Sequence, residues 1–406
     1  MNSIITEKIS TPVRYECDVC VAGGGVAGIA AALSAARAGA KVILLERGFM
    51  LGGLATAGIV TIYLALCDGR GHQVTFGIAE ELFKLSIEHG AEDRYPRVWL
   101  EGGTLEERRA ANRFEVQFNP QLFAMSAERV LREAGVKILY GATAVAAPTC
   151  DGKITEVVIE GKSGREAIRI NKSVVDTTGD ADICKLAGEE CRIFGGGNVL
   201  AAWYYGYGQG RYALNMCGFC DVPEEERAPG QEIPTLVNRR FVGLETEELS
   251  DMVQLSHGAI MNSLLRKRGE IPDLVPVTVG TIPQIRMTRR VAGKYTMTVE
   301  DEFRHFEDSV GVFSNWKKRG PVYELPLSSL YGERVKNLIT AGRCISSDDR
   351  MWDVTRVIPV CAVSGEAAGA AAAMSDDFGR MDVSALQAHL RSVGEPVHIA
   401  ELGELD

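Results

Sequence analysis

Residues 15–46, YECDVCVAGGGVAGIAAALSAARAGAKVILLE, constrain the fold more strongly than any other part of the chain. An apolar strand is predicted at residues 19–22, and it leads into a Gly-x-Gly-x-x-Gly turn and then into a helix of small residues. A second strand is predicted at residues 41–45 and is followed by Glu46. A strand, a glycine turn, a helix, a second strand and a final acid in this order are typical of a βαβ unit that binds a dinucleotide.

Each glycine of this turn has a physical role. Gly23 permits the tight turn, Gly25 lets a pyrophosphate approach the backbone, and Gly28 lets the helix pack closely on the strand. The helix N-terminus then faces the phosphates with the positive end of its dipole. Glu46, 23 residues after Gly23, can accept hydrogen bonds from a ribose diol. A glycine-rich turn without a ligand is the alternative, and the unit alone does not decide between NAD and FAD.

The composition argues against some classes of partner. The chain has 406 residues, of which 46% are hydrophobic and 24% are charged, so it is long enough for about two or three domains. A net charge of −10 argues against a nucleic-acid or anionic membrane surface. Residues 1–16 lack the pattern of a secretory signal, and the longest apolar stretch, residues 19–45, contains glycines, Arg37 and Lys41. We therefore expect a cytoplasmic protein without a nucleic-acid or membrane partner.

The ten cysteines are scattered, as expected of reduced and mostly buried thiols rather than of a disulfide framework. Cys17 and Cys20 belong to the strand that precedes the glycines, where positions three apart face opposite ways. Cys217 and Cys220 lie in a loop-like segment, but a zinc or iron–sulfur site needs more ligands, and no second pair has a suitable spacing. We expect both pairs to be structural, with redox or metal use of the second pair as the alternative, and we predict no metal site.

The middle of the chain continues the α/β pattern. A predicted helix precedes a strand-like segment at residues 137–145, and residues 154–170 have the pattern of a hairpin around a GKSG turn. Residues 173–183 form an apolar strand that ends in Thr-Thr-Gly-Asp. Asp180 and Asp182 in this segment are equally well explained as helix N-caps.

Residues 59–111 and 191–320 differ from the rest of the chain in composition and residue pattern. We assign them to a substrate-side domain inserted into the cofactor domain. The three glycines at 195–197 are not a second dinucleotide turn, because Arg192 and Phe194 precede them instead of an apolar strand. A second, built-in NAD(P)H domain is therefore not expected.

Near the C-terminus, residues 335–346 have a strand pattern that leads into Ala-Gly-Arg at 341–343. After a polar loop, Pro359 precedes a helix of small residues, a position where proline is tolerated because its missing N–H would be unpaired. Alanine and glycine let this helix lie close to another backbone. Its free N–H groups at 360–362 suit a developing negative charge.

These ordered segments resemble the FAD-dependent oxidoreductase family of the glutathione-reductase and fumarate-reductase-like flavoprotein superfamily. They are AGGGVAG, LLERGFMLGGLATAG, VVDTTGDADICKLAG, IRMTRRVAGKYTMTVED and LITAGRCISSDDRMWDVTRVIPVCAVSGEAAGAAAA. The resemblance implies an α/β fold, with a Rossmann-like FAD-binding domain (a parallel sheet with a β-meander) and an inserted α+β substrate domain. It assigns residues 1–58, 112–190 and 321–388 to the FAD-binding domain, 59–111 and 191–320 to the substrate domain, and 389–406 to a tail.

FAD is the cofactor that the resemblance implies. The ADP half would contact Gly23, Gly25, Gly28, Glu46, Arg47 and Gly53, with Val145 on the adenine-contacting strand and Thr178 and Gly179 where a strand closes over the dinucleotide. Leu54, Ala55 and Thr56 would lie near the flavin, and Gly342, Arg343, Asp349, Val360 and Cys361 would surround the ribityl chain and the pyrimidine edge.

Two departures from the family pattern matter. Several relatives carry a Thr-His pair where this chain has Asp348-Asp349, so a proton-transfer role of that histidine would pass to Asp349 or another residue. Disulfide reductases of the superfamily place a close cysteine pair soon after the LGG loop, whereas only Cys67 follows it here. Disulfide-reductase chemistry is therefore disfavoured.

The resemblance leads us to expect a dehydrogenase or reductase in which a hydride passes between flavin N5 and a small polar metabolite. An O₂-using oxidase or hydroxylase and a catalytically idle FAD-binding module are the alternatives. The electron acceptor or donor stays open, as does the oligomeric state. The candidate proton-transfer groups are His72, Tyr205, Tyr295, His305 and Asp349.

Arginines are the better candidates for substrate contacts, because guanidinium groups suit carboxylates and phosphates. Their ordinary explanation is pairing with nearby acids such as Glu300, Asp301, Asp348 and Asp353. The candidates are Arg286, Arg289, Arg290 and Arg356.

Overall fold

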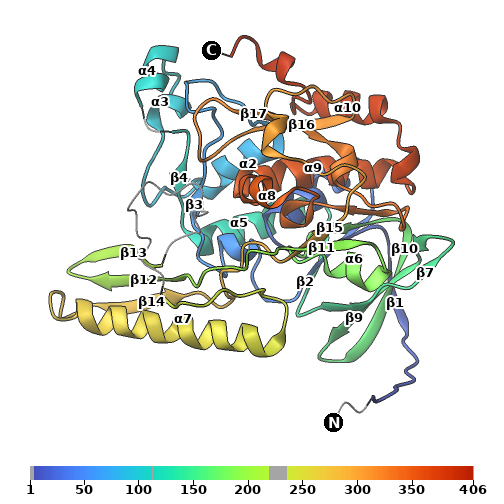
Figure 1. Cartoon of the computed structure of the whole chain (residues 1–406), viewed down its shortest axis with the longest axis horizontal. Coiled ribbons are helices and arrows are strands. Elements are labelled where there is room, and N and C mark those ends of the chain that lie inside the picture. Colours follow the sequence, from blue (N-terminus) through green and yellow to red (C-terminus); the bar gives the residue numbers. More distant parts are fainter. Residues whose placement is uncertain (1–3, 112, 219–235, 406) are drawn as a thin grey trace.

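The computed structural model describes residues 4–111, 113–218 and 236–405. Seven strands form the main sheet, which lies at the lower right of Figure 1. Five of its strands pair in parallel in the order β5-β2-β1-β10-β18, and β9 and β6 continue from β10 in antiparallel fashion. This architecture confirms the predicted α/β fold with a meander. The strands are β1 (Val13–Ala22), β2 (Val42–Glu46), β5 (Lys137–Tyr140), β6 (Thr143–Ala146), β9 (Glu156–Gly161), β10 (Gly164–Asp176) and β18 (Leu338–Thr340).

Several strand boundaries differ from the sequence prediction, two of them in the meander. Residues 137–145, predicted as one strand, form β5 and β6, because Gly141 with a φ of +64° turns the chain between them. The hairpin arm and the apolar segment that follows it form a single strand of 13 residues, β10. Residues 164–169 of β10 pair with β9, residues 167–176 pair with β1, and residues 174–176 pair with β18. One strand therefore joins the meander to the parallel sheet.

Helices α1 (Val26–Arg37) and α9 (Ile358–Met374) pack backbone against backbone. A Cβ atom on Gly365 would lie 2.3 Å from Ala27 O, and one on Gly369 would lie 2.2 Å from Ala31 O. Both contacts advance four residues along each helix, so the helices are parallel. The small residues of α9 are therefore required by this close approach, as the sequence predicts.

Other elements surround this helix pair. α2 and α10 pack on α9, and α5 packs on α1 and α2. Tyr63 and Phe83, which lie within residues 59–111, belong to the same buried core as α1 and α9, whereas the division of the chain into domains stays a prediction. The elements are α2 (Gly77–Ser86), α3 (Arg97–Leu100), α4 (Leu105–Ala110), α5 (Pro120–Glu133), α10 (Val383–Ser392), β3 (Ile62–Tyr63), β4 (Val116–Gln117), β7 (Thr149–Cys150), β8 (Lys153–Ile154), β16 (Ser309–Ser314) and β17 (Val322–Pro326).

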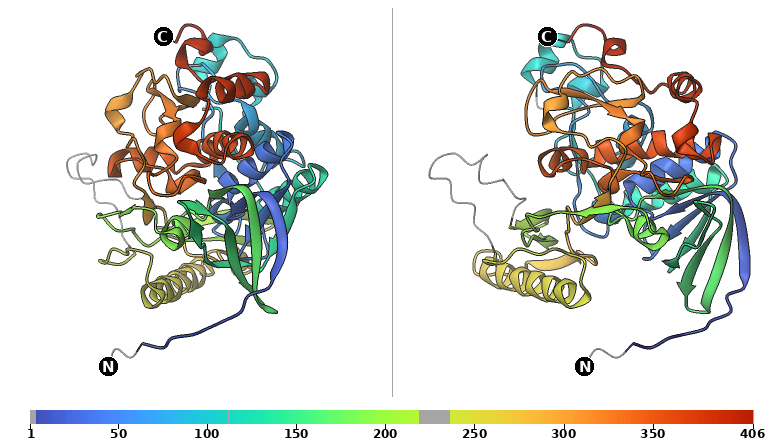
Figure 2. Two further views of the ribbon diagram at one scale, coloured as in Figure 1. Left: turned by 90° about the vertical axis from the view of Figure 1, so that its right-hand side faces the viewer. Right: turned by 45° about the vertical axis from the view of Figure 1, so that its right-hand side comes forward.

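A separate antiparallel sheet, in the order β13-β12-β14, is covered by the long helix α7. Figure 2 shows α7 (yellow) along the outer side of this unit. β11 precedes this unit in the chain and β15 follows it, and the two strands pair with each other as an antiparallel ladder. α6 lies between β10 and β11 in the chain. These elements are α6 (Asp182–Ala187), β11 (Cys191–Ile193), β12 (Ala202–Gly208), β13 (Arg211–Cys217), α7 (Thr246–Lys267), β14 (Val275–Val279) and β15 (Arg289–Val291).

A sharp bend separates α8 (Asp349–Thr355) from α9. Within the described ranges, no helix taken singly has both the length and the apolar content to cross a membrane. Only α8 and α9 taken together are long and apolar enough among the described helices, and the chain bends by 87° between them. Nearly all of α9 is buried inside the protein.

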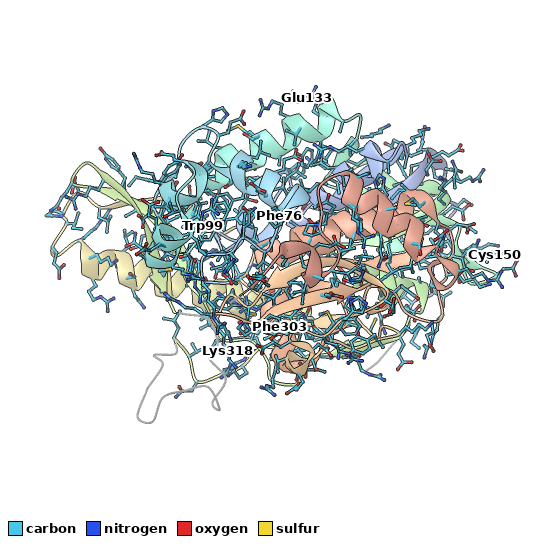
Figure 3. The ribbon with its side chains drawn as sticks, turned by 90° about the horizontal axis from the view of Figure 1, so that it is seen from above. Phe76, Trp99, Glu133, Cys150, Phe303 and Lys318 are labelled. Atoms are coloured by element: carbon cyan, nitrogen blue, oxygen red, sulfur yellow. The ribbon has the colours of Figure 1, made fainter. Side chains whose placement is uncertain are left out.

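The arrangement of the first cysteine pair differs from the prediction. A register shift between Cys17 and Val19 breaks the alternation of β1, so Cys17 and Cys20 are buried in the same core cluster. A hydrogen bond with Cys17 and burial both raise the pKa of the Cys20 thiol. The prediction that these side chains face opposite ways is therefore wrong. Cys217 is half-buried in β13, Cys220 lies outside the described residues, and Cys150 is exposed at the edge of the molecule (Figure 3).

The helix contact predicts opposite effects for two glycine-to-alanine substitutions. Gly369→Ala should destabilise the protein by roughly 2–3 kcal/mol, because its methyl group would overlap the backbone of α1. Gly258→Ala should stabilise it by roughly 0.5–1 kcal/mol, because Gly258 lies in α7 with no described atom within 4 Å of the new methyl group. Thermal and urea unfolding midpoints of the two variants measure this difference. Equal shifts in both variants would contradict the packing argument.

Candidate functional site

The candidate site lies at the edge where the parallel strands β2, β1, β10 and β18 end. The chain turns to one side of β1 to form β2 and β5, and to the other side to form β10 and β18. In open α/β sheets, ligands bind at such a switch point, beyond the carboxyl ends of the strands. Four loops therefore converge where the sequence places a dinucleotide.

The three glycines of the first turn are required for different reasons. Gly23 has a φ of +110°, and a Cβ atom there would lie 2.5 Å from Thr177 O. A Cβ atom on Gly28 would lie 1.8 Å from Gly23 O. Gly25, in contrast, has a φ of −68°, and no described atom would lie within 4 Å of a methyl group at this position. The described protein atoms therefore do not require glycine at position 25, whereas a ligand that approaches the backbone does.

Two helix N-termini point toward this edge. Gly25 caps α1 and Val357 caps α9, and neither cap is satisfied by a side chain in the described part of the chain. From the parallel contact of Ala27 with Gly365, and a rise of 1.5 Å per residue, α9 extends about 9 Å further than α1 in the N-terminal direction. Free N–H groups at a helix start attract negative charge. The site thus has two separated positions that suit anionic groups.

Glu46 closes the turn on the β2 side. Its carboxylate accepts hydrogen bonds from the backbone N–H groups of Gly24, at 3.0 Å, and Gly48, at 2.6 Å. These bonds hold a half-buried acid at the end of β2, next to the glycine turn, whereas Arg47 is exposed. The residues predicted for the ribose are therefore adjacent to the turn predicted for the phosphates.

The loop of residues 51–58 packs against the glycine turn. Gly52 N donates to Gly24 O at 2.8 Å, and a Cβ atom on Gly53 would lie 3.2 Å from Gly25 Cα. Leu54 is half-buried, and Ala55 and Thr56 are buried. Val145 is half-buried in β6, an edge strand of the sheet.

Gly342 lies where β18, α1 and α9 meet. It has a φ of +73°, its N–H donates to Ser364 Oγ at 2.9 Å, and a Cβ atom there would lie 2.8 Å from Ala27 Cβ and 3.6 Å from Cys361 Sγ. Burial raises the pKa of the Cys361 thiol to about 12, and the guanidinium groups of Arg343 and Arg356 oppose this rise. Val360 is buried beside Cys361 in the first turn of α9. The structure therefore brings these C-terminal residues to the start of α1.

An ionic network closes the β10 side. Arg343 lies across Gly179, pairs with Asp180 Oδ1 at 3.3 Å and donates to Arg286 O at 3.1 Å. Asp180 also accepts from Thr288 Oγ1 at 2.7 Å. Thr178, at the end of β10, donates to Asp176 Oδ1 at 2.7 Å.

The alternative role of the two aspartates as helix N-caps is wrong. Ala181, with a φ of +52°, occupies the N-cap of α6, and no side chain of the described residues caps this helix. Asp180 joins the Arg343 network instead, and Asp182 pairs with Arg289 at 2.7 Å.

Residues 281–291 run through the site as an irregular segment that ends in β15, rather than as a helix. Thr281 N donates to Ala57 O at 2.8 Å, and Gln284 Nε2 donates to Gly58 O at 2.8 Å. Further along, Arg289 and Arg290 are adjacent in β15, so their side chains take opposite faces. This segment connects the loop of residues 51–58 with the region that follows β18.

Arg286 is buried in the same segment and bonds to a neighbour. It is 6% exposed, its Nη1 donates to Gln284 O at 3.4 Å, and its Nη2 donates to Gln284 Oε1 at 3.3 Å. The Arg286 guanidinium therefore helps to hold Gln284, whose side chain donates to Gly58 O.

Arg290 is the most deeply placed charge of β15. It is 9% exposed, its Nη1 donates to Val291 O at 3.1 Å and to Ser346 Oγ at 3.2 Å, and its Nε has no hydrogen-bond partner among the described residues. Burial lowers the pKa of Arg290, and Asp349 opposes this effect. Asp349 itself is exposed at the start of α8, and burial nevertheless raises its pKa, with Arg290 opposing the rise. Asp348 is the N-cap of α8, where its carboxylate accepts from Met351 N at 2.7 Å.

Arg356 has the ordinary pairing that the sequence offered as its alternative. Its Nε donates to Asp353 Oδ1 at 2.7 Å, and Lys317 pairs with the same carboxylate. Burial opposes ionisation of Asp353, but Arg356 and Lys317 hold its pKa below the ordinary value. Arg356 O also accepts from Cys361 Sγ at 3.3 Å, so the ion pair supports the start of α9.

The other predicted proton-transfer groups are dispersed. Tyr205 OH bonds to Thr61 Oγ1 at 2.7 Å, close in sequence to the loop of residues 51–58, and burial raises its pKa. Tyr295 OH donates to Asp301 Oδ1 at 2.7 Å. His72 is half-buried, and its backbone pairs with Asp68. His305 lies instead beside Glu324 and His398.

Three polar or aromatic residues of the site were missed from the sequence. Asn198 is 3% exposed and its side chain bonds the backbone of Arg286 and Met287, which holds this irregular segment in place. Gln284 bonds to Gly58, and Trp352 Nε1 donates to Arg343 O at 2.8 Å. No local pattern marks Asn198 and Gln284, because each bonds to a segment distant in sequence.

A small cavity of about 20 Å³ adjoins the loop of residues 51–58. It lies between Gly58, Trp203 of β12, His257 of α7 and Gln284. The unit built from β12–β14 and α7 therefore borders the candidate site.

Comparison with protein families gives one match. A family model described as FAD dependent oxidoreductase matches residues 18–199 and 205–390. No curated protein matches the chain.

Several solved structures are similar to the chain. Thermovibrio ammonificans THI4 is 22% identical over 44% of this chain and 66% of its own, with a TM-score of 0.31. The 3-ketosteroid-delta4-(5alpha)-dehydrogenase of Rhodococcus jostii RHA1 is 15% identical over 89% of this chain and 98% of its own, with a TM-score of 0.37. A geranylgeranyl bacteriochlorophyll reductase-like protein of Thermoplasma acidophilum is 13% identical over 97% of this chain and 89% of its own, with a TM-score of 0.41.

The open space at Gly25 gives a test of the site. Gly25→Ala should leave the thermal midpoint of the apoprotein nearly unchanged but raise the Kd for FAD at least about tenfold, because the methyl group occupies the path of the ligand. Gly258→Ala in α7 is the matched control and should keep the wild-type affinity. Fluorescence titration of apoprotein with FAD measures both. Wild-type affinity in Gly25→Ala would show that the dinucleotide does not approach this turn.

Proposed function

Because the chain belongs to the FAD-dependent oxidoreductase family, we propose that it is a dehydrogenase or reductase that transfers a hydride to or from a small polar metabolite bearing an anionic group. FAD is its cofactor, and the chain is a flavin-dependent oxidoreductase. The nature of the substrate and the direction of the reaction form the proposal.

The residues present fit FAD. Gly25 leaves open space, Glu46 lies at the end of β2, and the N-termini of α1 and α9 offer free N–H groups. In the proposal, the first turn and Glu46 hold the ADP half, and Gly342, Arg343 and Cys361 lie at the flavin half. Bound FAD supplies a hydride acceptor or donor at the flavin ring.

The buried guanidinium of Arg290 carries the proposal for the substrate. No carboxylate of the described residues lies within 4.0 Å of it, and one of its nitrogens lacks a partner among them. A buried cation without a paired charge is unfavourable, and a carboxylate or phosphate of the substrate would satisfy it. The segment that carries Arg290 also contacts the loop of residues 51–58.

Asp349 is the proposed proton-transfer group. It is near enough to Arg290 for each group to oppose the effect of burial on the other's pKa. It lies in the loop where several relatives carry a histidine, and its raised pKa brings a carboxyl group closer to neutral pH. Arg290 would orient the substrate, and Asp349 would accept or return the proton that accompanies the hydride.

The proposed partners are a small-molecule substrate and a separate electron acceptor or donor. The proposed location is the cytoplasm, without nucleic-acid or membrane partners. The two alternative functions are those of an O₂-using flavin enzyme and of a catalytically idle FAD-binding module. The experiments below distinguish the proposal from both.

The reaction of the reduced protein with oxygen separates a dehydrogenase from an oxidase. The photoreduced, FAD-loaded protein is mixed with air-saturated buffer in a stopped-flow instrument, and flavin absorbance and peroxide are followed. We expect reoxidation over many seconds. Reoxidation within about a second with peroxide release would support the oxidase and refute the dehydrogenase.

The role of Arg290 is tested by anaerobic mixing with a panel of hydroxy acids, enoates and polyols. We expect carboxylate-bearing compounds to bleach the oxidised flavin or reoxidise the reduced one. Arg290→Met should raise the half-saturating concentration at least about tenfold, with a smaller effect on the limiting rate. Arg192→Met is the matched control, because Arg192 is the cross-strand neighbour of Arg290 but is exposed and paired with Glu190. Reaction with polyols alone, or equal behaviour of the two variants, would contradict an anionic substrate held by Arg290. No reaction with any compound would favour the idle module.

A further inference from the structure

A cluster of two histidines and one glutamate lies on the β16–β17 hairpin, away from the residues assigned to FAD. Glu324 belongs to β17, His305 lies in the loop that precedes β16, and His398 directly precedes a short 3-10 helix at the C-terminus. Figure 3 labels Phe303 in the same loop as His305. Three segments distant in sequence therefore place their side chains together.

The carboxylate of Glu324 is the fixed member of the cluster. It is 2% exposed, Oε1 accepts from Ile399 N at 3.0 Å, and Oε2 accepts from Phe306 N at 2.8 Å. Both backbone bonds orient the carboxylate with Oε2 toward the histidines. A buried carboxylate requires a compensating positive charge.

The two imidazole rings approach the same oxygen. Nδ1 of His398 lies 3.1 Å from Glu324 Oε2, Nδ1 of His305 lies 3.5 Å from it, and the ring centroids are 4.6 Å apart. One possible ligand atom from each of the three residues lies within 4.8 Å of the other two. Ligand atoms with metal bonds of about 2.0–2.2 Å are spaced roughly 3–4 Å apart around a single ion, and the distances of 3.1 and 3.5 Å to Glu324 Oε2 fall in this range.

Hydrogen bonding alone explains only part of this arrangement. The contact of His398 with Glu324 has the length of an ordinary hydrogen bond, but that of His305 is too long for a strong one. The other ring nitrogen of His305, Nε2, lies 3.6 Å from Oε1 of the exposed Glu307, which is also too long for a strong hydrogen bond.

We propose that His305, Glu324 and His398 bind one Zn²⁺ ion. Two imidazole nitrogens and one carboxylate oxygen are ligands that zinc accepts, and the exposed side of His305 leaves room for water as a further ligand. The ion would join the loop before β16 and the C-terminal residues 398–402 to β17. This site is independent of the proposed oxidoreductase reaction, and it departs from the expectation of a chain without a metal site.

Zinc binding is measured on the full-length, FAD-loaded protein after treatment with a chelator and desalting. Isothermal titration with ZnCl₂ should give one site per chain, and the thermal midpoint should rise when zinc is added. His305→Ala should weaken binding at least about tenfold and abolish the rise, because it removes a ligand without disturbing a buried side chain; His305 is 58% exposed.

His89→Ala is the matched control. His89 is also exposed, at 54%, and also lies near a glutamate, Glu88, at 3.8 Å, but outside the cluster. It should bind zinc like the wild type. Glu324→Gln is a second variant that should also weaken binding; if it does not fold, His305→Ala decides. A wild-type protein that binds no zinc, or binding that is equal in His305→Ala and His89→Ala, would overturn the proposal.

Discussion

The backbone contact between α1 and α9 is the constraint on which the site depends. Gly365 and Gly369 allow α9 to lie against Ala27 and Ala31 at a distance that no side chain would permit. This contact fixes the direction of both helices and the offset of about 9 Å between their N-termini. It also places Gly342 and Cys361 beside the start of α1. A helix encoded more than 300 residues after the first glycine turn thus becomes part of the same site.

The inserted unit reaches the site through one irregular segment. Residues 281–291 contact Ala57 and Gly58 at one end and Ser346 at the other. Asn198 holds this segment by bonds to its backbone. The alternation of β15 then sends Arg289 to Asp182 and buries Arg290 on the other face. A short piece of strand therefore decides which arginine pairs with an acid of the described residues and which does not.

Much of the cofactor half could be predicted from the sequence, because its signals are local. The strand, glycine turn and helix of residues 15–46 appear as predicted, and the small residues of α9 have the close packing expected of them. The side-chain partners could not be predicted. Asp180 and Asp182 have the composition of N-caps, yet they pair with Arg343 and Arg289 from distant segments. Cys17 and Cys20 share a face only because a register shift interrupts β1.

The sequence by itself determined the βαβ unit and the α/β class, because turn conformation, helix packing and strand order are encoded in the spacing of small and apolar residues. The use of FAD followed from the resemblance of the ordered segments to a known family, since the βαβ unit alone does not decide between NAD and FAD. Only the tertiary structure decided which charged residues are paired. Ion pairs join positions more than 100 residues apart, and their partners depend on how strands and loops are packed. For the same reason His305, a candidate for catalysis in the sequence, lies with Glu324 and His398, while Arg290 is buried without a paired acid among the residues that the structure describes.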